Sequence, residues 1–164
     1  MSVLNDDMKR VVREQRLGYI ATVCPDGTPN LSPKGTMQVW DDDHLVFADL
    51  GSPGTIANLG ENPAIEINMV DPFLRKGYRF KGTAEVIESG PDFDNVMTLF
   101  SDRQAGVNAR IRGFVMMTVT RALPVISPGY VGDVTESQML AQWEEYYASV
   151  NANSPASRTN PTIS

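Results

Sequence analysis

The chain has 164 residues, of which 41% are hydrophobic, and a formal net charge of −6 at pH 7 with its single histidine neutral. This length and apolar content are typical of one globular domain with a substantial core. An acidic chain has no broad positive field to attract nucleic acid or an anionic membrane, and no segment reaches the roughly 18 to 20 apolar residues of a membrane span. With a charged N-terminus in place of a signal peptide, we expect a cytoplasmic protein with neither partner.

The chain contains one cysteine, Cys24, and one histidine, His44. A single cysteine excludes a disulfide within the chain and a thiolate metal cluster, and a single histidine excludes a two-histidine zinc helix. The sequence also lacks a Walker loop and a Gly-x-Gly-x-x-Gly motif. We therefore expect no metal site, and no nucleotide binding through either of those motifs.

The first predicted element is an amphipathic helix over residues 4–15, with apolar side chains on one face and acidic residues in its first turn. Two strands follow over residues 17–24 and 31–40, joined by a Pro-Asp-Gly-Thr turn. Alternating apolar residues predict further strands over residues 45–49, 64–70, 78–87 and 111–120.

Three later helices are predicted from their N-terminal signals. The first begins after Ser52, the second follows Ser89 in an apparent capping box, and the last begins at Thr135 with Gln138 three residues on. Residues 151–164 are rich in Ser, Asn and Pro and predict a flexible polar tail, which leaves residues 1–150 as one domain. Six short strands with helices at the margins predict a mainly β fold, an antiparallel barrel with peripheral helices.

The strand over residues 31–40 carries a row of hydrogen-bond donors. Alternation places Ser32, Lys34, Thr36 and Gln38 on one face. Such a face suits a ligand laid along the strand, and it equally suits a strand that faces solvent. Pro29 and Pro33 lack an amide hydrogen and favour an edge strand or the lip of a site.

The segment after residue 49 has the features of a phosphate-binding turn. Ser52 is a good N-cap, Pro53 is a good first helical residue, and Gly54 permits close approach to the backbone amides. The hydroxyls of Ser52 and Thr55 add further hydrogen-bonding groups. Ordinary helix capping explains the same residues without a ligand.

Basic residues are concentrated within residues 75–81. Four of the fourteen Lys and Arg residues of the chain fall there, and Arg79 and Lys81 project from the same face of a strand. Two such cations can clamp one dianion through charge-assisted hydrogen bonds. A solvated cationic strand face is the alternative interpretation.

Taken in order, these motifs resemble the pyridoxamine 5′-phosphate oxidase-like family of FMN-binding split barrels. The resemblance covers residues 17–88, with weaker support to residue 120. It implies a split β-barrel homodimer with FMN at the interface, where both chains contact the cofactor. The FMN-binding residues that it implies are Ser32, Pro33, Lys34, Gly35, Thr36, Phe47, Ala48, Asp49, Ser52, Thr55, Arg79 and Lys81.

The resemblance also implies which part of the cofactor each group of residues contacts. The strand segment 32–36 lies along the flavin and its ribityl chain, residues 47–49 line the ring, and Ser52 and Thr55 bind the phosphate. The two basic residues of the strand over residues 78–87 reach the cofactor, often from the partner subunit. We further hypothesise that the charge of Lys34 favours the anionic reduced flavin.

Two departures from the family pattern bear on activity. Pyridoxamine phosphate oxidases carry an Arg-Lys pair after the serine of the phosphate turn, where this chain has Pro53 and Gly54. They also end in an arginine-bearing segment that grips the substrate phosphate, whereas the polar tail here has only Arg158. We therefore do not expect vitamin B6 oxidation.

The sequence leaves several functions open. The first is an FMN-dependent oxidoreductase that acts on an unidentified small substrate, and the second is a non-catalytic flavin-binding protein. Relatives of the fold bind the deazaflavin F420 or haem, and haem is the least favoured because His44 lies in a predicted exposed turn.

Overall fold

The computed structural model describes residues 2–100 and 108–153. This part of the chain forms two compact units. One contains the residues up to Val70 together with Gly77–Val125, and the other contains Asp71–Lys76 and the residues from Ile126 onward. Most of the predicted tail, from residue 154, lies outside the described residues.

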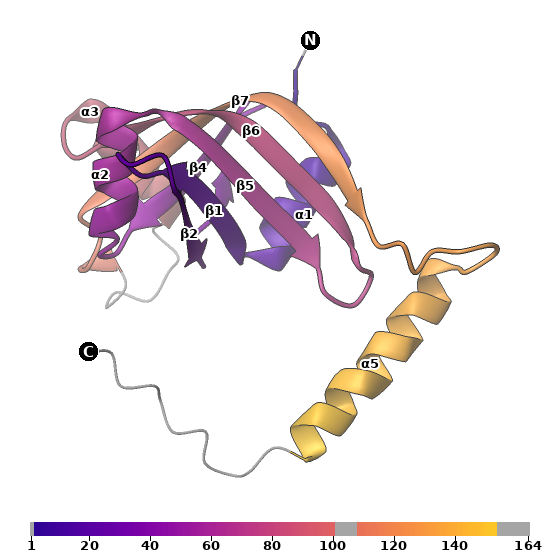
Figure 1. The fold of residues 1–164 in the computed structure, drawn as a ribbon. Helices are drawn as coiled ribbons and strands as arrows, with labels where there is room; N and C mark the ends of the chain where they lie inside the picture. The colour runs from indigo at the N-terminus through magenta and orange to yellow at the C-terminus, as the bar shows by residue number, and fades with distance from the viewer. Residues whose placement is uncertain (1, 101–107, 154–164) are drawn as a thin grey trace. The chain divides into compact units, whose positions relative to one another are not determined.

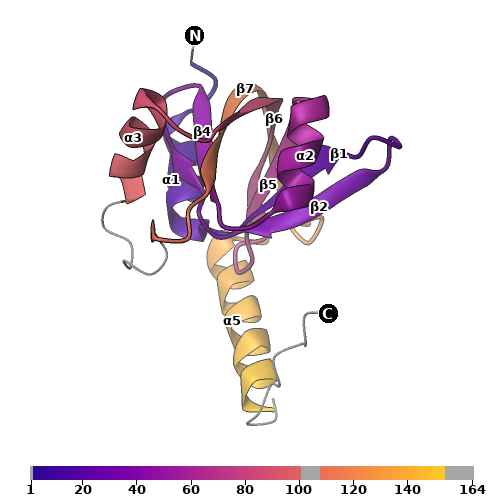
Figure 2. The same ribbon diagram turned by 90° about the vertical axis from the view of Figure 1, so that its left-hand side faces the viewer.

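The first unit is built on a curled antiparallel sheet with the strand order β2-β1-β5-β6-β7-β4-β3 (Figure 1). Figure 2 shows these strands curving around a common interior, with α2 beside β1 and β2. The strands are β1 (Gly18–Val23), β2 (Pro29–Lys34), β3 (Gln38–Val39), β4 (His44–Asp49), β5 (Ala64–Asp71), β6 (Lys76–Ile87) and β7 (Gly113–Ile126). The mainly β split-barrel fold is therefore confirmed, with seven strands instead of the expected six.

The extra strand arises because the segment predicted as one strand over residues 31–40 is broken. The break lies between Lys34 and Gln38, next to β4. There the hydroxyl of Thr36 accepts a hydrogen bond from the amide of Ala48 at 3.0 Å and donates one to its carbonyl at 3.2 Å. The Thr36 side chain thus takes the place of backbone hydrogen bonds to β4. The chain therefore ends β2 before this point and starts a separate strand, β3, after it.

The helices differ from prediction mainly at their caps. In α1 (Asp6–Gln15) the side chain of Asn5 caps the amide of Met8 at 2.9 Å. In α3 (Pro91–Met97), which continues into the short 3₁₀ helix η1 (Thr98–Phe100), the N-cap is Gly90 and no side chain caps it, so the capping box expected at Ser89 is wrong. The remaining helices are α2 (Pro53–Glu61) and α5 (Glu136–Ala152).

Two apolar clusters lie on opposite faces of the sheet. The larger fills the inside of the curl, where Val12 of α1 packs with residues such as Ile20, Phe47 and Phe80. The smaller lies where α3 and η1 cover the outer side of β4 and β7, and it is centred on Phe100 and Phe114, whose ring centroids are 5.1 Å apart. Strands β4 and β7 are therefore covered on both faces, which explains the nearly continuous burial of β4.

The second unit packs α5 against the loop between β5 and β6. Thr135 and Gln138 form the predicted capping box at the start of α5. The guanidinium of Arg75 lies 3.4 Å from the ring centroid of Trp143, and Lys76 pairs with Glu136 at 2.8 Å. None of the helices in the described ranges has the length and apolar character needed to cross a membrane.

We predict that Gly82→Ala destabilises the protein by about 1–3 kcal/mol or more, because overpacking at the β6–β7 contact forces the strands apart. A Cβ atom at this position would lie 1.9 Å from the carbonyl oxygen of Thr118. The matched control is Gly60→Ala in α2, where a Cβ would meet nothing within 4 Å and a gain of up to about 1 kcal/mol is expected. Urea unfolding measures both, and equal free energies of unfolding for the two variants would contradict the strand packing.

Candidate functional site

The ammonium group of Lys34 lies at the junction of β2 and the first turn of α2. It donates hydrogen bonds to the hydroxyl oxygens of Ser32 and Ser52, the latter at 2.7 Å. The residue is only 7% exposed. Burial lowers the pKa of Lys34 below its usual value, and the nearby charge of Asp49 partly opposes that shift. The site is therefore built around a buried cation.

Asp49 fixes the loop that joins β4 to α2. Its Oδ1 atom accepts hydrogen bonds from the amide of Gly51 at 3.0 Å and from the amide of Ser52 at 2.7 Å. Gly51 has a φ of 117°, which a residue with a side chain rarely adopts. The buried carboxylate thus holds the turn in a conformation that brings Ser52 to Lys34.

The N-terminus of α2 retains free hydrogen-bonding capacity. Ser52 occupies the N-cap position as predicted, but its hydroxyl makes no capping hydrogen bond and accepts from Lys34 instead. The next residue, Pro53, has no amide hydrogen, so the first-turn amides are those of Gly54 and Thr55. A Cβ atom at Gly54 would meet nothing within 4 Å, so this turn is open to approach. Amides at a helix start and a lysine ammonium together favour an anion.

Of the other residues that the sequence predicts for the cofactor on β2, β4 and α2, some are exposed and some are buried. Pro33 is exposed and alternates with Ser32 and Lys34 along β2, while Gly35 follows the end of the strand. Phe47 packs in the main core, so it can face a ligand only through its backbone. The buried members besides Phe47 are Thr36, Ala48 and Thr55, at 6%, 1% and 2% exposure.

Arg79 and Lys81 lie together on β6, as the sequence predicts, but they face a carboxylate. The carboxylate of Glu66 on β5 forms ion pairs with Arg79, whose Nε lies at 3.0 Å, and with Lys81, whose Nζ lies at 2.9 Å. Both cations alternate with buried Phe80 and so lie on the outward face of the sheet, away from the inward-facing Lys34. A groove of about 450 Å³ adjoins Lys81, and Ala21, Val23, Glu66 and Thr83 also line it. One chain alone therefore does not bring Arg79 and Lys81 to Lys34.

Glu66 is the site-flanking residue that sequence reasoning missed. Its position in an alternating strand marks it as outward-facing, which is visible in the sequence. Its pairing with Arg79 depends on the neighbour relation between β5 and β6, which becomes known only from the sheet order.

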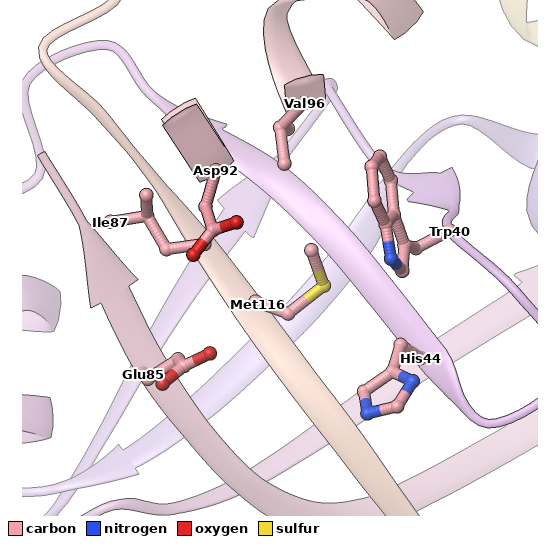
Figure 3. Close-up of a pocket in the computed structure, with 7 residues that line it drawn as sticks. All are labelled: Trp40, His44, Glu85, Ile87, Asp92, Val96 and Met116. Atoms are coloured by element: carbon pink, nitrogen blue, oxygen red, sulfur yellow. The ribbon is translucent and has the colours of Figure 1, made fainter. Parts of the chain in front are cut away.

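A second hollow, of about 230 Å³, lies beside α3 (Figure 3). Its lining residues are Trp40, His44, Glu85, Ile87, Asp92, Val96 and Met116. The Nδ1 atom of His44 lies 2.8 Å from an oxygen of Asp41. Two carboxylates in the wall disfavour a phosphate group there, so this hollow does not fit the anionic ligand that the Lys34 site favours.

Comparisons with known proteins agree on the family and the fold. The family model described as pyridoxamine 5′-phosphate oxidase matches residues 4–128. The structure of HupZ from Group A Streptococcus is 30% identical, with a TM-score of 0.67 over 76% of this chain and 95% of that chain. A search of curated proteins found no match.

Two further structures share the fold at lower identity. A structure described as an F420 reductase is 21% identical, with a TM-score of 0.55 over 73% of this chain and 98% of that chain. An FMN-binding protein from Syntrophomonas wolfei is 17% identical, with a TM-score of 0.59 over 74% of this chain and 90% of that chain. Because the family model spans well over half of the sequence, the chain belongs to the pyridoxamine 5′-phosphate oxidase family.

Proposed function

We propose that this protein binds FMN, with the phosphate held by Lys34 and the first turn of α2, and that it is an oxidoreductase acting on a small substrate. The observation that carries the proposal is the buried ammonium of Lys34 bonded to the hydroxyl of Ser52, next to open helix amides. Family membership and the shared fold with an FMN-binding protein support the choice of cofactor. When bound, FMN supplies hydride or electron exchange, and the protein supplies placement and charge.

The donor set fits a phosphate monoester. A dianion at the start of α2 would meet the Lys34 ammonium, the Ser52 hydroxyl and the amide of Gly54, each of which donates to oxygen. A bound dianion would also offset the desolvation of the Lys34 charge, which is what lowers its pKa. This position favours a role for Lys34 at the phosphate rather than at the ring edge.

The proposal extends to a homodimer in the cytoplasm with a shared cofactor site. The outward face of β1 and β2 exposes apolar side chains, including Tyr19 and Leu31, and Leu31 is 65% exposed. Covering this face with a second copy removes it from water. The same face carries Arg79 and Lys81 farther along the sheet, so a dimer can present these cations to the partner's flavin.

Two alternatives have specific support. The fold shared with an F420 reductase favours a deazaflavin cofactor as the second candidate. The sequence shows a cofactor cradle but no clear grip on a substrate, which is compatible with a non-catalytic flavin-binding protein. The visible spectrum separates the two cofactors, and turnover with NADH or NADPH separates enzyme from carrier.

We predict that the purified protein binds FMN at one molecule per chain with micromolar or tighter affinity, roughly −8 kcal/mol. Riboflavin lacks the phosphate and should bind about 10- to 100-fold more weakly, since each charge-assisted hydrogen bond contributes about 1.5–3 kcal/mol. Flavin fluorescence titration measures both constants. Equal affinities would remove the phosphate site, and no binding of either flavin would make F420 the leading candidate.

Lys34→Met should weaken FMN binding by about 10- to 100-fold and leave riboflavin binding nearly unchanged. Lys34→Arg should retain most of the FMN affinity because it keeps the charge. The charged form of Lys34 binds the phosphate, and burial lowers the pKa of this residue below 10.5. FMN affinity in the unmodified protein should therefore fall as pH rises toward that value, while Lys34→Arg stays flat. Titrations across this pH range test the account, and parallel curves for both proteins would contradict it.

Leu31→Asp should convert the dimer to a monomer and weaken FMN binding, because a charge replaces an apolar side chain at the proposed interface. Val131→Asp is the matched control, since Val131 is 71% exposed and lies in the second unit. Light scattering after size exclusion gives the mass of each. A monomeric unmodified protein that binds FMN fully would show that the cofactor site needs no second copy.

A further inference from the structure

We propose that Asn58 and Thr22 are positioning residues that set the orientation of α2, and thereby the selectivity of the site for a phosphorylated flavin. This inference rests on the proposed function. Neither residue belongs to the set that the sequence predicts for cofactor binding, and the hydrogen bonds of Lys34 go to Ser32 and Ser52 instead.

The two residues form the centre of a buried polar network between α2 and the sheet. Asn58 is 5% exposed and Thr22 is 2% exposed. The Nδ2 atom of Asn58 donates to the hydroxyl oxygen of Thr22 at 3.0 Å and lies 3.5 Å from the sulfur of Cys24. Asn30 of β2 donates to the same Thr22 oxygen at 3.1 Å, so one hydroxyl oxygen accepts from both a strand and a helix.

The network and the Lys34 contact originate from the same side of β2. Asn30 lies opposite Thr22 in the β1–β2 register, and Asn30, Ser32 and Lys34 follow one another at every second position. The helix is therefore tied to the sheet at two places. Lys34 binds Ser52 at the start of α2, and the Thr22 hydroxyl binds Asn58 farther along it.

The hydrogen bond between Asn58 and Thr22 restricts a motion of α2 that the contact between Lys34 and Ser52 leaves free. A single contact at the helix start permits α2 to rotate about its own axis, and apolar contacts such as those of Leu59 are not directional. A hydrogen bond from Asn58 is directional, and this side chain lies four residues after Gly54, on the same helix face. Fixing Asn58 therefore fixes where the first-turn amide of Gly54 lies around the helix axis.

A packing role alone would not require polar groups at this place. Burying an amide and a hydroxyl is unfavourable unless each finds a partner, and apolar residues of similar volume would fill the same space. The pairing of Asn58 with Thr22 is explained if the orientation of the helix, and not only its attachment, matters to the site.

The test compares FMN with riboflavin in Thr22→Val, which keeps the shape of the side chain and removes the hydroxyl. Riboflavin does not reach the helix start, so only the phosphorylated flavin reports the orientation of α2. We expect the ratio of FMN to riboflavin affinity to fall about tenfold, the loss of roughly one hydrogen bond to the phosphate, with riboflavin affinity unchanged. Thr22→Ser keeps the hydroxyl and should have the same ratio of FMN to riboflavin affinity as the unmodified protein.

Asn58→Leu provides an independent variant of the same contact, and thermal unfolding of every variant shows whether it is folded. Asn108→Leu is the matched control, because it removes a side-chain hydrogen bond to the carbonyl of Phe100 at 2.9 Å in another part of the sheet unit. This control should lose stability and keep the affinity ratio.

Two outcomes would overturn the positioning role, and a third would remove the phosphate site itself. An unchanged ratio in folded Thr22→Val and Asn58→Leu would overturn the positioning role. Equal weakening of FMN and riboflavin would also overturn it, since the network would then serve the fold as a whole. A ratio of one in the unmodified protein would instead remove the proposed phosphate site.

Discussion

The site depends on one interaction, the burial of the Lys34 ammonium where β2 meets α2. A charge in the interior is unfavourable unless polar partners surround it. Here the partners are two serine hydroxyls and the charge of Asp49, which also holds the amides that shape the turn. The β4–α2 loop and the end of β2 are thus constrained together, and a positive site persists in a chain with a net charge of −6.

The rest of the fold brings β2 to α2 through the path of one segment, residues 29–39. The hydroxyl of Thr36 takes over the hydrogen bonds of Ala48, which ends the pairing of this segment with β4 and lets β2 join β1 on the other side of the sheet. The inward-facing side of β2 then carries Lys34, which binds Ser52 at the start of α2, and Asn30, which binds Thr22. The place where this strand breaks therefore determines which residues of β2 lie beside α2.

Local pattern predicted much of this arrangement. Period-two alternation identified the strands and the donor row of Ser32 and Lys34, and the Ser52-Pro53 pair located the start of α2. The break near Thr36 was not predictable, because it depends on the backbone of β4 lying alongside. Capping propensity likewise predicts that the Ser52 hydroxyl accepts from an amide of its own helix. In the structure it accepts from the buried Lys34 instead. The clamp of Glu66 on Arg79 and Lys81 requires the sheet order, which no local pattern contains.

A crystal structure of the protein with FMN tests the central claim most directly, because the chain offers two separate places for one phosphate, Lys34 at the start of α2 and the pair of Arg79 and Lys81 on β6. The account predicts that the phosphate lies within hydrogen-bonding distance of the Lys34 ammonium and the amide of Gly54 at the start of α2. A phosphate bound between Arg79 and Lys81 on the outward face, with Lys34 still bonded only to its serines, would contradict it.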